Sequence, residues 1–291
     1  MSAIALTLIT GVGLGALYFL VASGLSLIYG LMHVLNFAHG AFLTLAAFIG
    51  WQTAQWLGVS SWWALLASIA VGALVGAAFA TLTELLLIRP LYERHIEQVL
   101  VTVGLALAAV ALFEGIWGSD PVTVAGPPWL KQTTGVLGAR IPNIYWLLMI
   151  CAVIVLLALV LFLKKTRYGM IIRAGVENRA MVTALGIDVR RAFTLVFAIG
   201  GAAAGIGGVL AMHYMTNVSA HLGQTLLIFA FIVTVVGGLG SLAGAAIASV
   251  LVAVLQQFAN FYLGGTGDFI VVALLAVVLL VRPRGLMGRT A

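Results

Sequence analysis

Polar residues within apolar segments are the places where this chain could do chemistry. The motif NFAHG places Asn36, His39 and Gly40 directly after an apolar segment. An amide and an imidazole can replace water around a small polar molecule, and a glycine at a helix junction leaves backbone groups free to face a cavity. We therefore predict that Asn36, His39 and Gly40 line a pathway. The alternative for His39 is a structural hydrogen bond to a neighbouring carbonyl oxygen.

A weaker echo of this motif, NVSAHLG, occupies residues 217–223 in the second half of the chain. Both motifs place an asparagine and a histidine near a glycine, at a point where one apolar segment gives way to the next. The echo suggests an internal repeat, although so short a match is at least as compatible with chance.

Residue patterns for catalysis are missing from the sequence. The apolar segments contain only two carboxylates, Glu84 and Glu114, each near a segment end, and no HExxH, GxSxG or GxxxxGK[ST] motif is present. Cys151 is the only cysteine, and the five histidines have no paired spacing within a span, so we predict neither a metal site nor a cofactor. An ion-driven carrier usually needs a buried ionisable group. An uncharged pathway without an ATP-binding motif indicates that another subunit supplies the energy.

Composition determines the class of protein. Hydrophobic residues make up 63% of the chain and charged residues 8%, against about a quarter charged in soluble domains. We predict an all-α, polytopic integral membrane protein with a single transmembrane domain over residues 1–291. The net charge of +6 comes from basic residues at segment ends, without interleaved aromatic residues, so nucleic acid is not an expected partner and membrane lipid is.

Nine apolar stretches are long enough to be spans at about 20 residues per crossing, and eight is the next count that fits. Two are weak: 40–58 contains Gln52 and Gln55, and the apolar core of 267–281 is short. Either could be tilted, broken or re-entrant. The predicted spans cover residues 5–30, 40–58, 62–88, 99–117, 143–163, 193–215, 222–239, 243–263 and 267–281.

The stretch 164–192 carries seven of the fourteen Lys and Arg residues; with its two acidic residues it has a net charge of +5. Such an excess beside spans marks the cytoplasmic side. Residues 171–184 have a mixed polarity typical of an amphipathic helix along the membrane surface, and Gly186 is placed to end it. This cytosolic loop is predicted to contact a partner.

Parity of the crossings orients the whole chain. Residues 89–98, the 164–192 loop and the basic C-terminal tail lie inside, which leaves the N-terminus and the Gly- and Pro-rich segment 118–142 outside. The segment 118–142 is predicted to be an ordered loop and not a domain. One feature fits poorly, because residues 31–39 would form a cytosolic loop without Lys or Arg.

Glycine is enriched, with 34 residues in the chain, and clusters within spans. Small residues at these spacings let helix backbones approach closely. For any one cluster static packing is the more frequent explanation, but their number favours a tightly packed bundle.

Four segments together carry a resemblance to a known family: GLMHVLNFAHGAFLTLAAF at 30–48, ENRAMVTALGIDVRR at 177–191, FIVTVVGGLGSLAGA at 231–245 and VRPRGLMG at 281–288. In this order and spacing they resemble the LivH-type permease of branched-chain amino acid ATP-binding-cassette (ABC) importers. The resemblance covers nearly the whole chain.

The resemblance implies a multi-pass subunit of the bacterial inner membrane that works by alternating access. It implies four kinds of contact: a second, LivM-type permease, two cytosolic ATP-binding subunits, a periplasmic solute-binding protein and the solute. In similar permeases a cytosolic loop docks on the ATPase, and the matching positions here are Glu177, Asn178, Ala184 and Gly186.

Alternative functions remain open from the sequence. Similar permeases are associated with urea, short amides and other small organic solutes. A passive channel for a small neutral solute fits the uncharged spans, although such a channel has no need of a long basic cytosolic loop like 164–192. A scaffold or enzyme subunit of a respiratory-type complex would need buried ionisable residues or cofactor-ligating histidine pairs.

Overall fold

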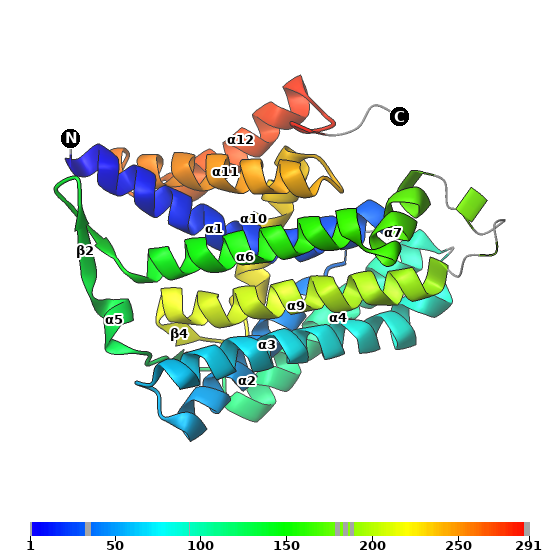
Figure 1. Cartoon of the computed structure of the whole chain (residues 1–291), viewed down its shortest axis with the longest axis horizontal. Helices are drawn as coiled ribbons and strands as arrows, with labels where there is room; N and C mark the ends of the chain where they lie inside the picture. The colour runs from blue at the N-terminus through cyan, green and yellow to red at the C-terminus, as the bar shows by residue number, and fades with distance from the viewer. Residues whose placement is uncertain are drawn as a thin grey trace.

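The computed structural model describes residues 2–32, 36–92, 94–177, 181–182, 186 and 189–287. Within these ranges nine helices correspond one to one with the nine predicted spans, which confirms the all-α membrane fold (Figure 1). They are α1 (Ser2–Met32), α2 (His39–Leu57), α3 (Trp62–Thr83), α4 (His95–Trp117), α6 (Ile144–Lys165), α9 (Val189–Met215), α10 (Leu222–Gly237), α11 (Leu242–Tyr262) and α12 (Gly267–Val281).

Six helices of the described chain are long and apolar enough to cross a membrane by themselves: α1, α3 with its extension, α4, α6, α9 and α11. The two predicted weak spans, α2 and α12, fall outside this set. So does α10, a helix of 16 residues whose shortness the sequence analysis did not anticipate. With 16 and 15 residues, α10 and α12 are too short to span about 30 Å of hydrocarbon alone and depend on neighbouring helices.

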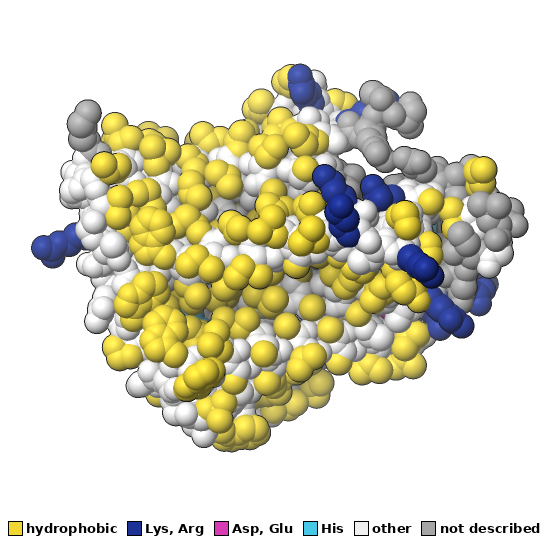
Figure 2. All heavy atoms as spheres, in the orientation of Figure 1, with side chains coloured by type: hydrophobic (Ala, Val, Ile, Leu, Met, Phe, Trp, Pro, Cys, Tyr) yellow, Lys and Arg dark blue, Asp and Glu magenta, His cyan; other side chains and the backbone are white. Residues whose placement is uncertain are grey.

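The bundle has two chemically different ends. The basic end carries α7 (Arg167–Glu177), the turn at residues 89–92 and the tail at 282–287, and α1 and α6 run toward it while α9 runs away from it (Figure 1). On the face in Figure 2, most Lys and Arg side chains lie toward this end, and the remaining surface is largely hydrophobic. This arrangement agrees with the predicted grouping of the basic segments.

The opposite end, which we call the loop end, is formed by residues 118–142. This segment is ordered: β1 (Val122–Thr123) pairs antiparallel with β4 (Asn217–Val218), α5 covers Pro128–Lys131, and β2 (Thr133–Val136) forms a hairpin with β3 (Ala139–Pro142). Leu137 and Gly138 make the hairpin turn with φ values of 52° and 78°. Positive φ at both central residues matches the right-handed twist of the flanking strands.

The start of α2 corrects one topological expectation. Residues 31–39 were expected to form a cytosolic loop, but Asn36 is 2% exposed and His39 0% exposed, so these two residues lie inside the bundle, whereas Phe37 between them is 38% exposed. Residues 33–35 lie outside the described ranges. Because Asn36 and His39 do not face the cytosol, the lack of Lys and Arg beside them no longer conflicts with the positive-inside pattern.

The same structural unit occurs twice. In each half a long helix (α1 or α9) precedes an N…AH motif, a helix that begins inside the bundle (α2 or α10), a tight turn and another helix (α3 or α11). The two turns match closely: Gly58 and Gly238 have φ values of 89° and 103°, and Ser61 and Ser241 cap the next helix with their hydroxyls. Packing is matched as well, because α1 packs on α11 and α9 on α3. The described residues therefore support the internal repeat that the sequence echo suggested.

Glycines hold the two repeats together. A Cβ on Gly40 would lie 2.7 Å from the carbonyl oxygen of Gly223, and a Cβ on Gly200 would lie 3.1 Å from that of Gly24. The α3–α9 contact is similar, since a Cβ on Gly76 would lie 3.0 Å from the Cα of Gly205. In lipid, where hydrophobic burial does not drive helix association, such close backbone packing is a main source of stability.

Candidate functional site

Asn36 folds the backbone into the turn that begins α2. Its Oδ1 accepts a hydrogen bond from the backbone N–H of Ala38 at 3.0 Å, and the N–H of His39 donates to the carbonyl oxygen of Asn36 at 3.2 Å. Asparagine favours such turns because its side chain imitates a backbone acceptor. The buried Nδ2 of Asn36 has no hydrogen-bond partner among the described residues.

His39 connects this turn to α1. Its Nε2 lies 3.0 Å from the carbonyl oxygen of Val21, and its ring meets Phe42 edge-on at 5.8 Å between centroids. The Nδ1 atom is buried and, within the described ranges, has no partner. His39 therefore makes the carbonyl contact considered as its structural alternative, while one polar atom remains available.

The structure brings Asn36, His39 and Gly40 together, but at the contact between the two repeats and not on an open surface. All three are buried, and Gly40 packs against the backbone of Gly223. The N–H of Gly223 donates to Thr44 Oγ1 at 2.9 Å and closes this contact. Their role along a pathway stays a prediction.

The predicted coupling loop begins differently from the expectation. The amphipathic helix predicted over 171–184 is observed as α7, Arg167–Glu177, so it starts four residues earlier. Thr166 explains the start, because its Oγ1 accepts from the N–H of Gly169 at 3.0 Å and caps the helix. Glu177 is the last residue of α7, whereas Asn178 and Ala184 lie outside the described residues.

Gly186 is exposed and has a φ of 76°, and no atom of the described residues lies within 4 Å of the position that a Cβ would occupy. A positive φ is the conformation expected of a glycine that ends a helix. Gly186 therefore has the backbone conformation of a helix-ending glycine, but residues 183–185 lie outside the described ranges, so its place at a helix end and its docking role stay predictions.

A buried carboxylate at the basic end escaped the sequence analysis as a site. Glu84 is 0% exposed and begins a short π-helical segment, Glu84–Ile88, that continues α3. Its Oε2 accepts a hydrogen bond from Thr194 Oγ1 at 2.8 Å, and its Oε1 accepts one from the Tyr92 hydroxyl. Glu84 therefore ties the end of α3 to the start of α9, next to the coupling loop. The sequence feature that could have identified Glu84 is its position as one of only two carboxylates in the predicted spans.

The second carboxylate also has a partner from a distant segment. His221 Nε2 lies 3.1 Å from Glu114 Oε1, and His221 Nδ1 lies 3.0 Å from Gln224 Oε1. The sequence analysis noted Glu114 and the 217–223 motif separately. Nothing in their spacing, 107 residues apart, predicted that they meet.

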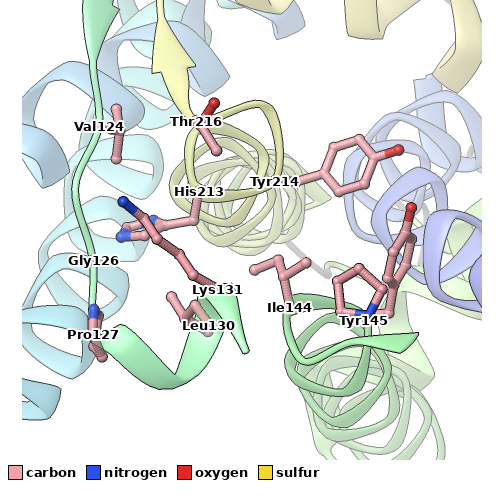
Figure 3. Close-up of a pocket in the computed structure, with 11 residues that line it drawn as sticks. Val124, Gly126, Pro127, Leu130, Lys131, Ile144, Tyr145, His213, Tyr214 and Thr216 are labelled. Atoms are coloured by element: carbon pink, nitrogen blue, oxygen red, sulfur yellow. The ribbon is translucent and has the colours of Figure 1, made fainter. Parts of the chain in front are cut away.

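A cavity of about 240 Å³ lies at the loop end, beneath the segment 118–142. Its polar lining comes from Lys131, His213, Tyr214, Tyr145 and Thr216 (Figure 3). The rings of Tyr145 and Tyr214 meet edge-on with centroids 5.7 Å apart. The cavity is smaller than most ligand pockets, which measure about 300–1,000 Å³. In the described part of the chain no three His, Cys, Asp or Glu side chains gather closely enough to hold a metal ion.

Comparison with known proteins assigns the family. The family model for the branched-chain amino acid transport system, permease component, matches residues 7–281. The chain belongs to this permease family. No solved structure matches the chain.

Curated relatives of this permease cover nearly its full length. It is 29% identical over 288 residues to the high-affinity branched-chain amino acid permease protein LivH of Escherichia coli K12, covering 96% of this chain and 94% of LivH. It is 29% identical to BraD of Pseudomonas aeruginosa, covering 97% of this chain and 95% of BraD. The fructose import permease protein FruF of Bifidobacterium longum is also 29% identical, over 86% of this chain and 69% of FruF.

Proposed function

We propose that this permease is one transmembrane subunit of an ATP-driven importer that carries branched-chain amino acids across the bacterial inner membrane. The family match over residues 7–281 carries the proposal. Similarity to LivH and BraD over almost their whole length favours the branched-chain substrate over others.

The importer contains further subunits in this proposal. A second permease of the LivM type completes the membrane core, two cytosolic ATP-binding subunits supply energy, and a periplasmic binding protein delivers the solute to the loop end. ATP binding and hydrolysis then rock the bundle between outward and inward access. The repeat of two structural units supports such a motion, because transporters commonly move one repeat against the other around a site at their interface.

Transport by the reconstituted complex tests the substrate. The permease and its partners are placed in proteoliposomes loaded with ATP, and uptake of radiolabelled leucine is measured with and without the binding protein. We expect leucine uptake that needs both ATP and the binding protein and is inhibited by isoleucine and valine. Uptake of fructose, urea or acetamide in place of leucine would reject the amino-acid assignment, as would uptake without ATP.

The exposed position of Gly186, between α7 and α9 in the chain, supports the coupling role proposed for Glu177, Asn178, Ala184 and Gly186. Gly186→Val forces a β-branched residue to the positive φ of 76°, at a backbone cost of about 1 kcal/mol or more, and adds bulk to the docking surface. We expect the variant to insert normally but to lose ATPase association and transport.

Gly186→Asn is the matched control, because asparagine tolerates positive φ. Loss of ATPase association in both variants indicates a clash at the docking surface, and loss in the valine variant alone indicates backbone strain. Normal recruitment and uptake in both would remove Gly186 from the coupling mechanism.

The proposal that Asn36, His39 and Gly40 contact the solute requires α2 and α10 to separate during the cycle. Nδ2 of Asn36 and Nδ1 of His39 have no partner among the described residues, and this supports the proposal, because buried polar atoms without partners are uncommon in native structures. We expect Asn36→Ala to reduce transport per assembled complex more than it reduces yield or melting temperature. A collapse of yield with normal transport per complex would make the motif a packing and capping element.

A further inference from the structure

The cavity at the loop end is enclosed by three segments of this chain: the loop from Val124 to Lys131, the start of α6 and the end of α9 (Figure 3). The loop is held against α9 because β1 pairs with β4 and the N–H of Val124 donates to the carbonyl oxygen of Thr216 at 2.9 Å. Gly126 allows a close approach, since a Cβ there would lie 2.9 Å from Cδ2 of His213. This chain alone therefore supplies the walls of the cavity.

Lys131 gives the cavity a positive charge. Of the described residues that line the cavity, Lys131 is the only one with a formal charge when histidine is neutral. Its ammonium group makes no hydrogen bond or ion pair with a described residue. A cation in this position suits an anionic group such as a carboxylate, because charge-assisted hydrogen bonds are stronger than neutral ones.

His213 supplies a buried acceptor to the same cavity, since its side chain lines the cavity and the residue is only 9% exposed. Its Nδ1 lies 2.9 Å from the carbonyl oxygen of Val209, and because a carbonyl oxygen can only accept, Nδ1 carries the proton. In the neutral ring Nε2 is then an acceptor, and it makes no hydrogen bond to a described residue. Such an atom suits a donor, for example an ammonium group.

Thr216 lines the cavity in a strained conformation, with a φ of 58°. β-Branched residues rarely adopt positive φ, and strained backbone of this kind is concentrated at binding and catalytic sites. Leu137, the other described non-glycine residue with positive φ, lies in a hairpin turn that requires it, whereas Thr216 forms the link between α9 and β4. Glycine would fit this link without strain, so the threonine side chain stands at the cavity at a cost in stability.

The rest of the lining is mainly apolar, and the size of the cavity is that of a small solute. Its volume of about 240 Å³ lies below the roughly 300–1,000 Å³ of pockets for drug-sized ligands. The shape and charge together suit a small molecule that has a carboxylate, an ammonium group and a short apolar side chain. The apolar lining residues are Val124, Pro127, Leu130, Pro142 and Ile144.

We propose that the cavity at the loop end binds the transported amino acid, with its carboxylate at Lys131 and its ammonium group at Nε2 of His213. The apolar wall then contacts the branched side chain. This inference rests on the proposed function and specifies a site where the solute is held. A sugar lacks both charged groups and would gain little from either residue.

Protection of a thiol tests occupancy of the cavity. In a Cys151→Ser background, Thr216→Cys places a thiol at an exposed position of the cavity wall. In the purified complex without binding protein, we measure the rate of its reaction with a water-soluble thiol reagent in the presence of leucine, isocaproate, which lacks the ammonium group, or isoamylamine, which lacks the carboxylate. We expect leucine to slow the reaction severalfold, isocaproate to slow it less and isoamylamine to have the smallest effect. Thr133→Cys is the matched control, because Thr133 is exposed on β2 and does not line the cavity, so its rate should not change.

Lys131→Gln tests the carboxylate contact. The Kd of leucine for the complex without binding protein should rise roughly three- to tenfold, between the effects of losing an exposed ion pair and a buried charged hydrogen bond, with the melting temperature unchanged. Arg140→Gln is the matched control, because Arg140 is exposed on β3 at the same end and does not line the cavity. An unchanged Kd in Lys131→Gln, or an equal rise in Arg140→Gln, would overturn the contact.

Absence of protection by leucine at position 216 would overturn the inference. Protection by added phosphatidylglycerol in place of leucine would assign the cavity to a lipid headgroup and overturn it as well. If proteoliposomes carry no leucine while leucine protects position 216, the substrate proposal fails and the amino-acid site stands. If leucine is carried and neither test responds, the inference about the cavity alone fails.

Discussion

Gly40→Ala is the most direct test of the contact between the two repeats. The new Cβ would lie 2.7 Å from the carbonyl oxygen of Gly223, whereas ordinary van der Waals contact begins at 3.4 Å, so the backbones must separate by the difference of 0.7 Å. Because the clash is with backbone, no flexible side chain can yield. Overpacking of this kind costs about 1–3 kcal/mol. Stretching the 2.9 Å bond from Gly223 N–H to Thr44 Oγ1 adds about 0.5–1.5 kcal/mol.

Gly104→Ala is the matched control for this substitution. Gly104 lies within α4 with no atom of the described chain within 4 Å of its Cβ position, so alanine should be neutral or stabilise the helix by up to about 1 kcal/mol. We measure thermal melting of the detergent-purified complex, followed by tryptophan fluorescence, and expect a lower melting temperature for Gly40→Ala alone. Equal melting temperatures for the two variants would refute the close-packed contact between α2 and α10.

Three further predictions concern the rest of the bundle. Glu84→Ala removes the buried acceptor of the Tyr92 and Thr194 hydroxyls and should lower the free energy of unfolding by about 1–3 kcal/mol. Glu84→Gln keeps an acceptor oxygen and should retain most of this stability. Equal losses in the two variants would contradict a stabilising role for the hydrogen bonds. Ser61→Ala and Ser241→Ala remove equivalent helix caps and should lower stability by similar amounts, about 1 kcal/mol each; effects of unequal size would argue against equivalent turns. In a Cys151→Ser background, cysteine at Thr133 should react with an impermeant thiol reagent in intact cells and cysteine at Lys165 should not; the reverse pattern would invert the topology. Lys165 is used because the neighbouring Thr166 caps α7.

The sequence was sufficient to predict the helices because lipid imposes a simple rule on composition. Each run of about 20 apolar residues became a helix, and the weak pattern of 40–58, with Gln52 and Gln55, became a helix that begins inside the bundle. The basic stretch likewise predicted a surface helix. Its first residue was misplaced by four positions, because the capping hydroxyl of Thr166 was not recognised.

Long-range contacts could not be predicted in the same way. Glu114 and His221 are 107 residues apart, and Glu84 and Thr194 are 110 apart, so no local periodicity relates either pair. The sequence also could not predict whether a short polar segment lies inside the bundle or outside it. NFAHG has the composition of a loop between spans, and only the packing of Gly40 on Gly223 shows that it lies within the bundle.

The two copies of the repeat differ at their histidines. His39 is the first residue of α2 and is buried against the Val21 carbonyl, whereas His221 is the residue before α10 and is exposed beside Glu114. His39 directly precedes Gly40, but Leu222 stands between His221 and Gly223, so His221 lies one residue further from the contact between the two glycines. The first histidine therefore fastens α2 to α1, and the second links the start of α10 to α4.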